Sequence, residues 1–305
     1  MKKKIFGVAL VMVMSLSLVG CKSSDYKKAV ELEEQGDYSG ALELFNGIPD
    51  YKDSSDHITY CTDMDNAVTA YDDAKTQLET LNADLQTKID AATTLTSSGT
   101  PLDETLITTL ETKVSEAKAA KVEVPEMPET AEDINKAADT MNAADYTSVI
   151  SSLDSAYSDL DTSIKQYALV DNPTEAFVIE RLGNVEDIVD ISAVTEDNDP
   201  NGHLGRAGGY TAQIYFSSAN INQSSVYGST LIDKGTDAGG SIEVYSTVED
   251  ATTRETYLAA FDGGIFASGS HKVVGTCLVR TSDKLTASQQ QEFEAAIIEA
   301  LTALE

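Results

Sequence analysis

The sequence is poor in the residues that build metal centres and disulfide frameworks. Its 305 residues include no tryptophan, three cysteines and three histidines. Three cysteines are too few for a disulfide scaffold, and we expect Cys61 and Cys277 to be free, buried thiols, with a disulfide between them as the alternative. The histidines, His57, His203 and His271, lie in separate segments without the spacing of zinc ligands, so we expect no zinc site.

Basic residues are also scarce. Lysine and arginine number 21 against 51 aspartates and glutamates, which gives a formal net charge of -30 at pH 7. Such a surface repels the phosphates of nucleic acids and of anionic lipids, so we expect no nucleic-acid partner. Hydrophobic residues make up 41% of the chain and recur periodically, so the acidity does not indicate disorder.

Long apolar runs are absent except near the N-terminus. Three lysines at positions 2–4 precede an apolar run over residues 5–18, which is followed by Val19-Gly20-Cys21. As a helix, this run of about 14 residues would extend about 21 Å, short of the roughly 30 Å hydrocarbon core of a bilayer. A positive start, an apolar run and a small residue before a cleavage point are typical of a secretory signal. An uncleaved membrane helix and a signal peptide without lipid are the alternatives.

The residues Leu18-Val19-Gly20-Cys21 resemble the lipobox of bacterial lipoproteins. The resemblance implies cleavage of residues 1–20 as a signal peptide and attachment of a diacylglyceryl group to the sulfur of Cys21. Residues 21–25 would then be a lipidated tether, anchored to the extracytoplasmic face of the cell membrane. Two acyl chains hold a protein stably at a bilayer, where one holds it marginally. After removal of residues 1–20, the chain would keep 18 basic and 51 acidic residues, a formal charge of about -33.

Residues 26–61 carry the pattern of a helical hairpin. Apolar residues recur at helical spacing before and after Gly36-Asp37-Tyr38, a turn signal, and a further helix is predicted to run up to Cys61. This turn, together with Ala41 and Phe45, resembles one tetratricopeptide-type unit. A single unit cannot bury its own apolar face, so we interpret it as a small helical cap on the next helix, with a partner-docking site as the alternative.

Residues 62–170 show three apolar stripes that are typical of long packed helices. The first stripe predicts a helix from about Asp63 to Thr96. The second follows Thr100 and Pro101, which we expect to be the cap and the first residue of its helix. The third stripe has the most regular spacing and consists of Tyr146, Ile150, Leu153, Tyr157, Leu160, Ile164 and Tyr167. Short breaks between the stripes predict antiparallel helices in a bundle or coiled-coil stalk.

Residues 171–305 are richer in glycine and β-branched residues and predict a compact α+β domain. Asn172 is expected to cap a helix that reaches Leu182. A C-terminal helix should begin at the capping box of Thr286 and Gln289. Strands are predicted at 188–194, 210–216, 241–245 and 272–281, with a helix over 248–261. This order predicts one mostly antiparallel sheet with helices on one face, and the whole chain is thus predicted to be a multidomain α+β protein.

Three blocks of this domain resemble a C-terminal module of other bacterial surface lipoproteins. The blocks are residues 193–202, 234–245 and 267–275. No activity is established for that module, so the resemblance implies a cellular context and no chemistry.

The segment 197–202, Asp-Asn-Asp-Pro-Asn-Gly, fits the opening of a calcium-binding loop. Asp197, Asp199 and Asn201 place side-chain oxygens at alternate positions of a tight turn. Position twelve is Gly208, where an EF-hand loop has a bidentate glutamate, and a strand rather than a helix is predicted before the loop. We therefore expect either a weak calcium site completed by a carboxylate from elsewhere or a polar turn without metal.

Two further patterns are weaker candidates for chemistry. Glycine-rich turns near Arg206 and Lys234 could hold an anion, although neither has the residues of a phosphate loop. Ser270 and His271 adjoin, but neighbouring residues of a strand point to opposite faces, which argues against a joint catalytic role. No Gly-x-Ser-x-Gly motif stands in this domain, and we expect no catalytic residues.

These features predict a lipid-anchored extracytoplasmic protein whose helical stalk presents an α+β domain for binding. The ligand is expected to be a protein, an envelope component or a small molecule. The alternatives are a structural or assembly lipoprotein that docks a membrane complex through its helices, and an extracytoplasmic hydrolase. A deep pocket with converging polar residues would favour the hydrolase, and a continuous apolar patch on the helices would favour docking.

Overall fold

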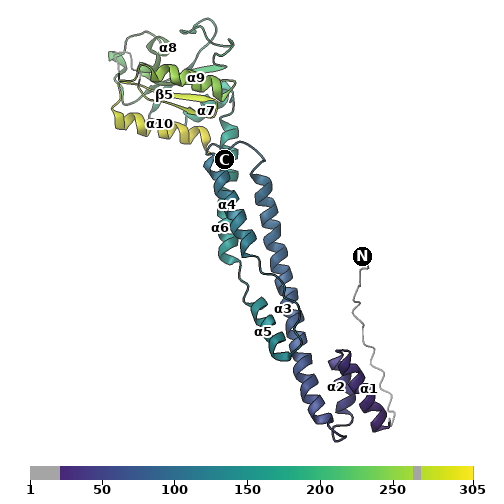
Figure 1. The fold of residues 1–305 in the computed structure, drawn as a ribbon. Coiled ribbons are helices and arrows are strands. Elements are labelled where there is room, and N and C mark those ends of the chain that lie inside the picture. The colour runs from purple at the N-terminus through teal and green to yellow at the C-terminus, as the bar shows by residue number, and fades with distance from the viewer. Residues whose placement is uncertain (1–20, 264–268, 305) are drawn as a thin grey trace. The chain divides into compact units, whose positions relative to one another are not determined.

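The computed structural model describes residues 21–263 and 269–304, and Figure 1 shows the elements in chain order. The expected signal peptide, residues 1–20, lies outside the described residues. The chain divides into two compact units. One comprises the chain up to Asp84 together with Lys121–Tyr146, and the other comprises Leu85–Ala120 together with the chain from Thr147 onward. In the described part of the chain, no helix combines the length and apolar character needed to cross a membrane.

The first unit begins with the expected helical hairpin, α1 (Lys22–Glu34) and α2 (Tyr38–Asn46). Gly36 takes a positive φ of 78°, which a turn between two helices requires and glycine tolerates. The side chain of Asp37 then caps α2 by accepting a hydrogen bond from the amide of Gly40 at 2.9 Å. Ala29 and Phe45 are fully buried where the two helices pack.

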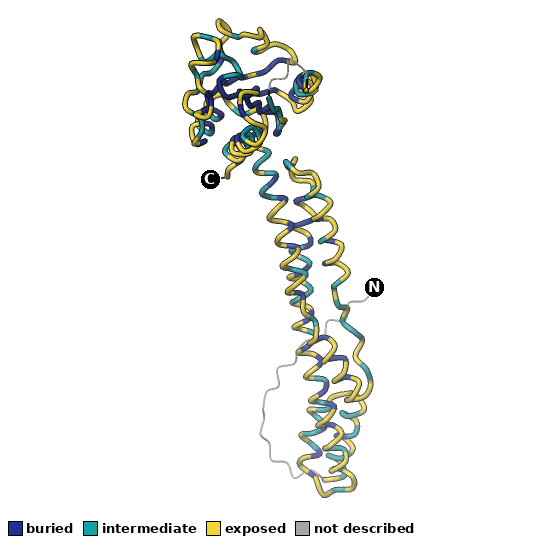
Figure 2. The backbone as a smooth tube through the Cα atoms, turned by 90° about the vertical axis from the view of Figure 1, so that its left-hand side faces the viewer, coloured by how far each residue is buried: buried dark blue, intermediate teal, exposed yellow. Residues whose placement is uncertain are grey.

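The third helix, α3 (Ser54–Leu95), corrects the prediction of two separate helices. One helix was predicted to end at Cys61 and another to begin at about Asp63, whereas the backbone is helical throughout. Residues 54–95 contain neither glycine nor proline. Buried positions also continue through the expected break, at Cys61 and Met64. In Figure 2 buried positions recur at short intervals along the long helices.

The segment between α4 (Thr105–Ala120) and α5 (Ala131–Asn142) is fastened to α3 by side-chain hydrogen bonds. The Tyr71 hydroxyl donates to the carbonyl of Pro125. The Tyr146 hydroxyl donates to Oδ1 of Asn82 at 2.8 Å and accepts from the amide of Val122 at 2.9 Å. These bonds satisfy backbone groups of a stretch that has no helix or strand of its own.

In the second unit, α4 packs against α6 (Thr147–Leu169). The expected cap at Thr100 and Pro101 is wrong, because α4 begins at Thr105, whose amide donates to the Asp103 carboxylate at 2.9 Å. The segment just before α4 is hydrogen bonded to α6. The amide of Asp103 donates to the hydroxyl of Ser163 on α6 at 3.0 Å. A second prediction, of helices that pack side by side along apolar stripes, is confirmed, since Leu110 and Leu160 are fully buried.

The C-terminal part of this unit contains a five-stranded antiparallel sheet in the order β1-β2-β3-β5-β4. The single strand predicted over 272–281 is instead a hairpin of two strands, turning at Gly275, whose φ is 57°. The strands are β1 (Ile188–Ala193), β2 (Ala212–Ser218), β3 (Gly239–Val244), β4 (His271–Val274) and β5 (Cys277–Thr281). Short helical turns α8 (Leu231–Lys234), η1 (Gln223–Ser225) and η2 (Gly235–Ala238) connect β2 to β3.

Helices cover both faces of this sheet, which corrects the prediction of helices on one face. α7 (Glu175–Leu182) and α10 (Ala287–Thr302) pack on the apolar face, where Phe216 and Val279 are fully buried. α9 (Val248–Ala259) packs on the other face, with Ala251 and Leu258 against Leu278. Adjacent strand residues point to opposite faces, so Leu278 and Val279 belong to different layers. Figure 1 shows α9 and α10 on opposite sides of the strands.

Two helix starts in this domain test the capping predictions. The capping box at Thr286 and Gln289 is confirmed at the start of α10. The expected cap of α7 is wrong, because Thr174 accepts the hydrogen bond from the amide of Phe177. Asn172 instead has a positive φ of 48°, and its side-chain oxygen accepts a hydrogen bond from Thr211 at 3.0 Å.

The chain enters the domain through Val170, directly after α6. Its side chain is fully buried in the core beneath the apolar face of the sheet. Its carbonyl accepts hydrogen bonds from the amide and the hydroxyl of Thr276, at 2.9 and 3.1 Å. The start of the domain is therefore bonded to the turn of the β4–β5 hairpin.

Candidate functional site

The face of the sheet under α9 is polar although it is buried. Gln213, Ser241 and Glu243 have no exposed surface, and Tyr215 and Arg280 are 4% and 7% exposed. The strand register sets Gln213 opposite Glu243, and Tyr215 and Arg280 on either side of Ser241. Burying polar and charged groups is costly unless each finds partners, so this layer needs an explanation beyond packing.

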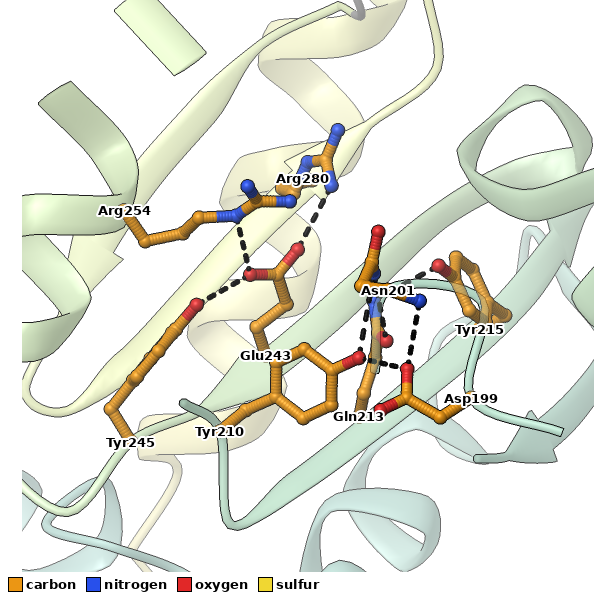
Figure 3. Close-up of polar contacts among 9 residues, drawn as sticks. All are labelled: Asp199, Asn201, Tyr210, Gln213, Tyr215, Glu243, Tyr245, Arg254 and Arg280. Carbon is orange, nitrogen blue, oxygen red and sulfur yellow. Dashed lines mark hydrogen bonds and ion pairs between the residues drawn. The ribbon is translucent and has the colours of Figure 1, made fainter. Parts of the chain in front are cut away.

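Glu243 lies at the centre of this layer, as Figure 3 shows. One carboxylate oxygen accepts from Nη1 of Arg280 at 2.9 Å. The other accepts from the hydroxyl of Tyr245 at 2.7 Å and from Nε of Arg254 at 3.1 Å. Burial alone would raise the pKa of Glu243, but the charges of Arg280 and Arg254 outweigh it and lower the pKa. Glu243 is therefore held ionised between two guanidinium groups.

Asp199 forms a second carboxylate centre, in the loop before β2. It accepts hydrogen bonds from the amide of Asn201 at 2.9 Å, the amide of Leu204 at 2.8 Å and the hydroxyl of Tyr210. Burial acts to raise the pKa of Asp199, but the hydrogen bonds from Tyr210 and these amides lower it to about 2. The pKa of Tyr210 is raised by its burial and by its bond to Asp199.

The loop and the sheet are joined by a chain of amide contacts. Nδ2 of Asn201 lies 3.4 Å from the Tyr210 hydroxyl and 3.5 Å from Oε1 of Gln213. Gln213 in turn donates to the hydroxyl of Tyr215 at 3.0 Å. The polar layer thus extends from the strands into the loop (Figure 3).

A pocket of about 490 Å³ opens beside this layer, between the loop and α9. Its walls include the rings of Tyr210 and Tyr245, which meet edge to face with centroids 6.4 Å apart. The guanidinium of Arg254 lies over the ring of Tyr257, 5.3 Å from its centroid. The other lining residues are Asn201, His203, Gly208, Gly209, Asp250 and Thr253. Aromatic walls with a few convergent polar groups, at this volume, suit a small-molecule ligand.

The predicted calcium ligands are only partly brought together. Asp197 is exposed, whereas Asp199 and Asn201 point toward Tyr210 and the polar layer. Both oxygens of Asp199 already accept backbone amides, as in an Asx-type turn. Among the described residues, no group of three or more histidine, cysteine, aspartate or glutamate side chains is placed to hold a metal ion. A calcium site at this loop stays a prediction.

The basic residues of the two glycine-rich turns each donate to a backbone carbonyl. Arg206 donates from Nε to the carbonyl of Gly202 at 2.8 Å. Lys234 donates to the carbonyl of Gln223 at 3.0 Å. Each cation stabilises its own loop.

Ser270 and His271 have separate partners. Ser270 donates to Glu294 at 2.9 Å, whereas His271 lies between Glu255 and Asp262, with ring nitrogens 3.1 and 3.2 Å from their carboxylates. The divergence agrees with the alternation of side chains along β4.

Cys61 and Cys277 are free and buried, as the sequence analysis expected. Burial raises the pKa of each thiol to about 12, helped at Cys61 by a hydrogen bond to Glu33. The thiolate, which is the reactive form, is thus strongly disfavoured at neutral pH.

Sequence reasoning missed the residues that form this site, chiefly Glu243, Arg254 and Arg280. A usable signal was present, since β3 ends in Ser-Ile-Glu-Val and β5 reads Cys-Leu-Val-Arg-Thr, with charged residues in otherwise apolar or small-residue strands. Alternation of this kind ordinarily indicates a solvent-facing side, and only the position of α9 shows that the side is covered. Comparison with models of protein families, with curated proteins and with solved structures finds no match for this chain.

Proposed function

We propose that this chain is a lipid-anchored extracytoplasmic protein whose C-terminal α+β domain binds a ligand in the pocket between α9 and the loop before β2. The sequence Leu18-Val19-Gly20-Cys21 supports the anchor. Cys21 is exposed, and α1 begins directly after it. The strongly acidic composition is compatible with a protein that is attached to the membrane through its lipid and whose folded part is repelled by anionic lipid headgroups.

One observation carries the binding function: a charged layer that is buried in the domain also forms the wall of a pocket. Arg254 and Tyr245 line the pocket and at the same time contact the buried Glu243. A domain that needed only stability could fill this layer with apolar side chains at equal or lower cost. Retaining charge beside a cavity is typical of a site that recognises a polar ligand.

Binding is favoured over hydrolysis by the protonation states around the pocket. Asp199 and Glu243 have lowered pKa values and several hydrogen-bond donors each, and Tyr210 and Tyr245 have raised pKa values. A general acid or base works best with a pKa near the operating pH. These four groups are displaced from that range, which supports a role in holding a ligand rather than in moving protons.

The binding proposal is tested by blocking the pocket. Thr253 is exposed on α9 and lines the pocket, so Thr253→Trp should fill it without disturbing the core. Thr252→Trp is the matched control, because Thr252 is exposed on a different face of the same helix and is not among the residues that line the pocket. The mature chain with Cys21→Ser is incubated with an envelope extract, washed and analysed by native mass spectrometry.

We expect a small molecule retained by the parent chain and by Thr252→Trp, and lost from Thr253→Trp. A species retained equally by Thr253→Trp, or no retained species at all, would contradict the proposal.

The anchor is tested separately in cells. Cys21→Ala should move the protein from the membrane fraction to the soluble fraction, and mass spectrometry of the parent chain should find an acylated cysteine at the mature N-terminus. A mature chain that begins at another residue would rule the anchor out.

A further inference from the structure

Arg254 is the one arginine or lysine among the described residues that line the pocket, and its guanidinium is only partly used by the protein. Nε donates to Glu243 at 3.1 Å. Within residues 21–263 and 269–304, no hydrogen bond or ion pair is found for the two terminal nitrogens, Nη1 and Nη2. The side chain is 22% exposed, so it is neither buried with the sheet nor free in solvent.

The contact with Glu243 fixes the direction of the remaining donors. Glu243 also accepts from Arg280 and Tyr245, so its position is set from three sides. A guanidinium is planar, and when Nε is engaged its two terminal nitrogens form a fork of parallel donors along another edge. Such a fork matches the two oxygens of a carboxylate, and the charge makes these hydrogen bonds about twice as strong as neutral ones.

The other walls of the pocket supply surfaces for a ring. The hydroxyls of Tyr210 and Tyr245 already donate to Asp199 and Glu243, so these residues offer the pocket mainly their ring surfaces. Tyr257 is 56% exposed beside Arg254 and adds a third ring.

We propose that the pocket binds a small organic acid, with the carboxylate on the terminal nitrogens of Arg254 and a ring against the tyrosine side chains that line the pocket. This inference rests on the proposed binding function and names the chemical class of the ligand. A sugar acid and an aromatic acid share this chemistry, and the two are separated by experiment.

Of the pocket-lining residues within 21–263 and 269–304, Asp250 alone is acidic. Its carboxylate accepts from the hydroxyl of Thr247 at 2.7 Å at the start of α9. Glu243 lies 3.1 Å from Nε of Arg254, but Arg280 shares its charge, so these three side chains together carry a net charge of +1. Carboxylates farther than about 8 Å from Arg254 are screened by physiological salt. Local recognition by Arg254 is therefore compatible with an acidic protein.

The test uses two pairs of probes in which a neutral amide replaces the carboxylate: glucuronate with glucuronamide, and phenylacetate with phenylacetamide. Binding to the mature chain with Cys21→Ser is measured by NMR titration. We expect the acid of one pair to bind at least about tenfold more tightly than its amide, because a charge-assisted pair of hydrogen bonds is lost with the amide. The pair that shows the difference identifies the ring as sugar or aromatic.

Two variants tie the effect to the pocket. Arg254→Lys keeps the charge and removes the planar fork, so the acid should bind about tenfold more weakly. Asp250→Asn keeps an oxygen for Thr247 and removes a nearby negative charge, so the acid should bind a few-fold more tightly while the amide is unchanged. The control is Arg181→Lys on α7, on the opposite face of the sheet, where Arg181 lies over Phe177. Near-ultraviolet circular dichroism shows whether each variant keeps its fold.

Equal affinity for acid and amide in both pairs, no binding of either acid, or unchanged binding by folded Arg254→Lys would overturn the inference. If the envelope extract yields a retained ligand that lacks a carboxylate, the inference fails while the binding function stands. If neither the extract nor the acids give binding that Thr253→Trp abolishes, both fail.

Discussion

Glu243 and Arg280 are diagonal neighbours on adjacent strands, and Nη1 of the arginine lies 2.9 Å from Oε1 of the glutamate. Glu243 stands opposite Leu278 in the register, and Arg280 stands opposite Ser241. Both charged residues are buried. A buried ion pair contributes little net stability by itself. Removing one partner is destabilising, because the other charge is then buried without a counter-charge in a medium of low dielectric constant.

Glu243→Gln should therefore be strongly destabilising. The amide has nearly the shape of the carboxylate but carries no charge, so Arg254 and Arg280 would be left without their shared counter-charge. We expect a loss of about 3–5 kcal/mol in the free energy of unfolding. Urea denaturation followed by near-ultraviolet circular dichroism measures it, and a loss under about 1 kcal/mol would show that the layer does not depend on this charge.

Ser241→Ala, two residues before Glu243 on the same face of β3, should have little effect on the free energy of unfolding. The Ser241 hydroxyl is buried and has no hydrogen-bond partner among the described residues. Removing an unpaired polar group leaves no other group unsatisfied, so we expect a change within about 1 kcal/mol, in either direction. The same urea experiment applies, and a large destabilisation would mean that the hydroxyl has a partner in solution.

Asp199 should make stability depend on acid pH. Its pKa is lowered from 3.8 to about 2 in the folded protein. A lowered carboxylate pKa stabilises the folded state above the unfolded pKa and loses that contribution as pH falls through the folded value. The stability difference between the parent chain and Asp199→Asn should therefore be constant near neutral pH and shrink between about pH 4 and pH 2.

This comparison cancels the general effect of protonating the other carboxylates. Melting temperatures of both proteins across that range provide the measurement. A difference that stays constant down to pH 2 would show that the hydrogen bonds to Asp199 are not made in solution.

The buried thiols should be unreactive in the native protein. Cys61 and Cys277 are both fully buried, and burial raises the pKa of each to about 12. In the mature chain with Cys21→Ser, we expect no rapid reaction with Ellman's reagent at pH 8, and release of both thiols after unfolding. Rapid reaction of either thiol before unfolding would show local opening around that residue.

Much of the helical structure could be predicted from the sequence because it is decided locally. The capping box at Thr286 needs only residues three apart, and the stripe of α6 needs only a regular spacing. The start of α4 could not be predicted in this way. Its amide cap depends on Asp103, whose own backbone is held by Ser163 sixty residues later in the chain.

The candidate site was invisible to sequence reasoning for a similar reason. Glu243, Arg254 and Arg280 come from β3, α9 and β5, and their contacts depend on strand order and register rather than on spacing along the chain. The alternation of polar and apolar residues in these strands is also ambiguous. The same pattern is compatible with a polar face exposed to solvent and with a polar face covered by a helix. The loop at Asp199 was noticed, but its oxygens are engaged by backbone amides that a pattern of residue types does not reveal.

The bond between Val170 and Thr276 has a mechanical and a practical consequence. Tension applied along α6 would reach the turn between β4 and β5 directly, because the last carbonyl before the domain is hydrogen bonded there. A recombinant fragment cut at Asp171 would lose this connection together with a fully buried valine, so a truncation that is meant to fold must begin upstream, within α6.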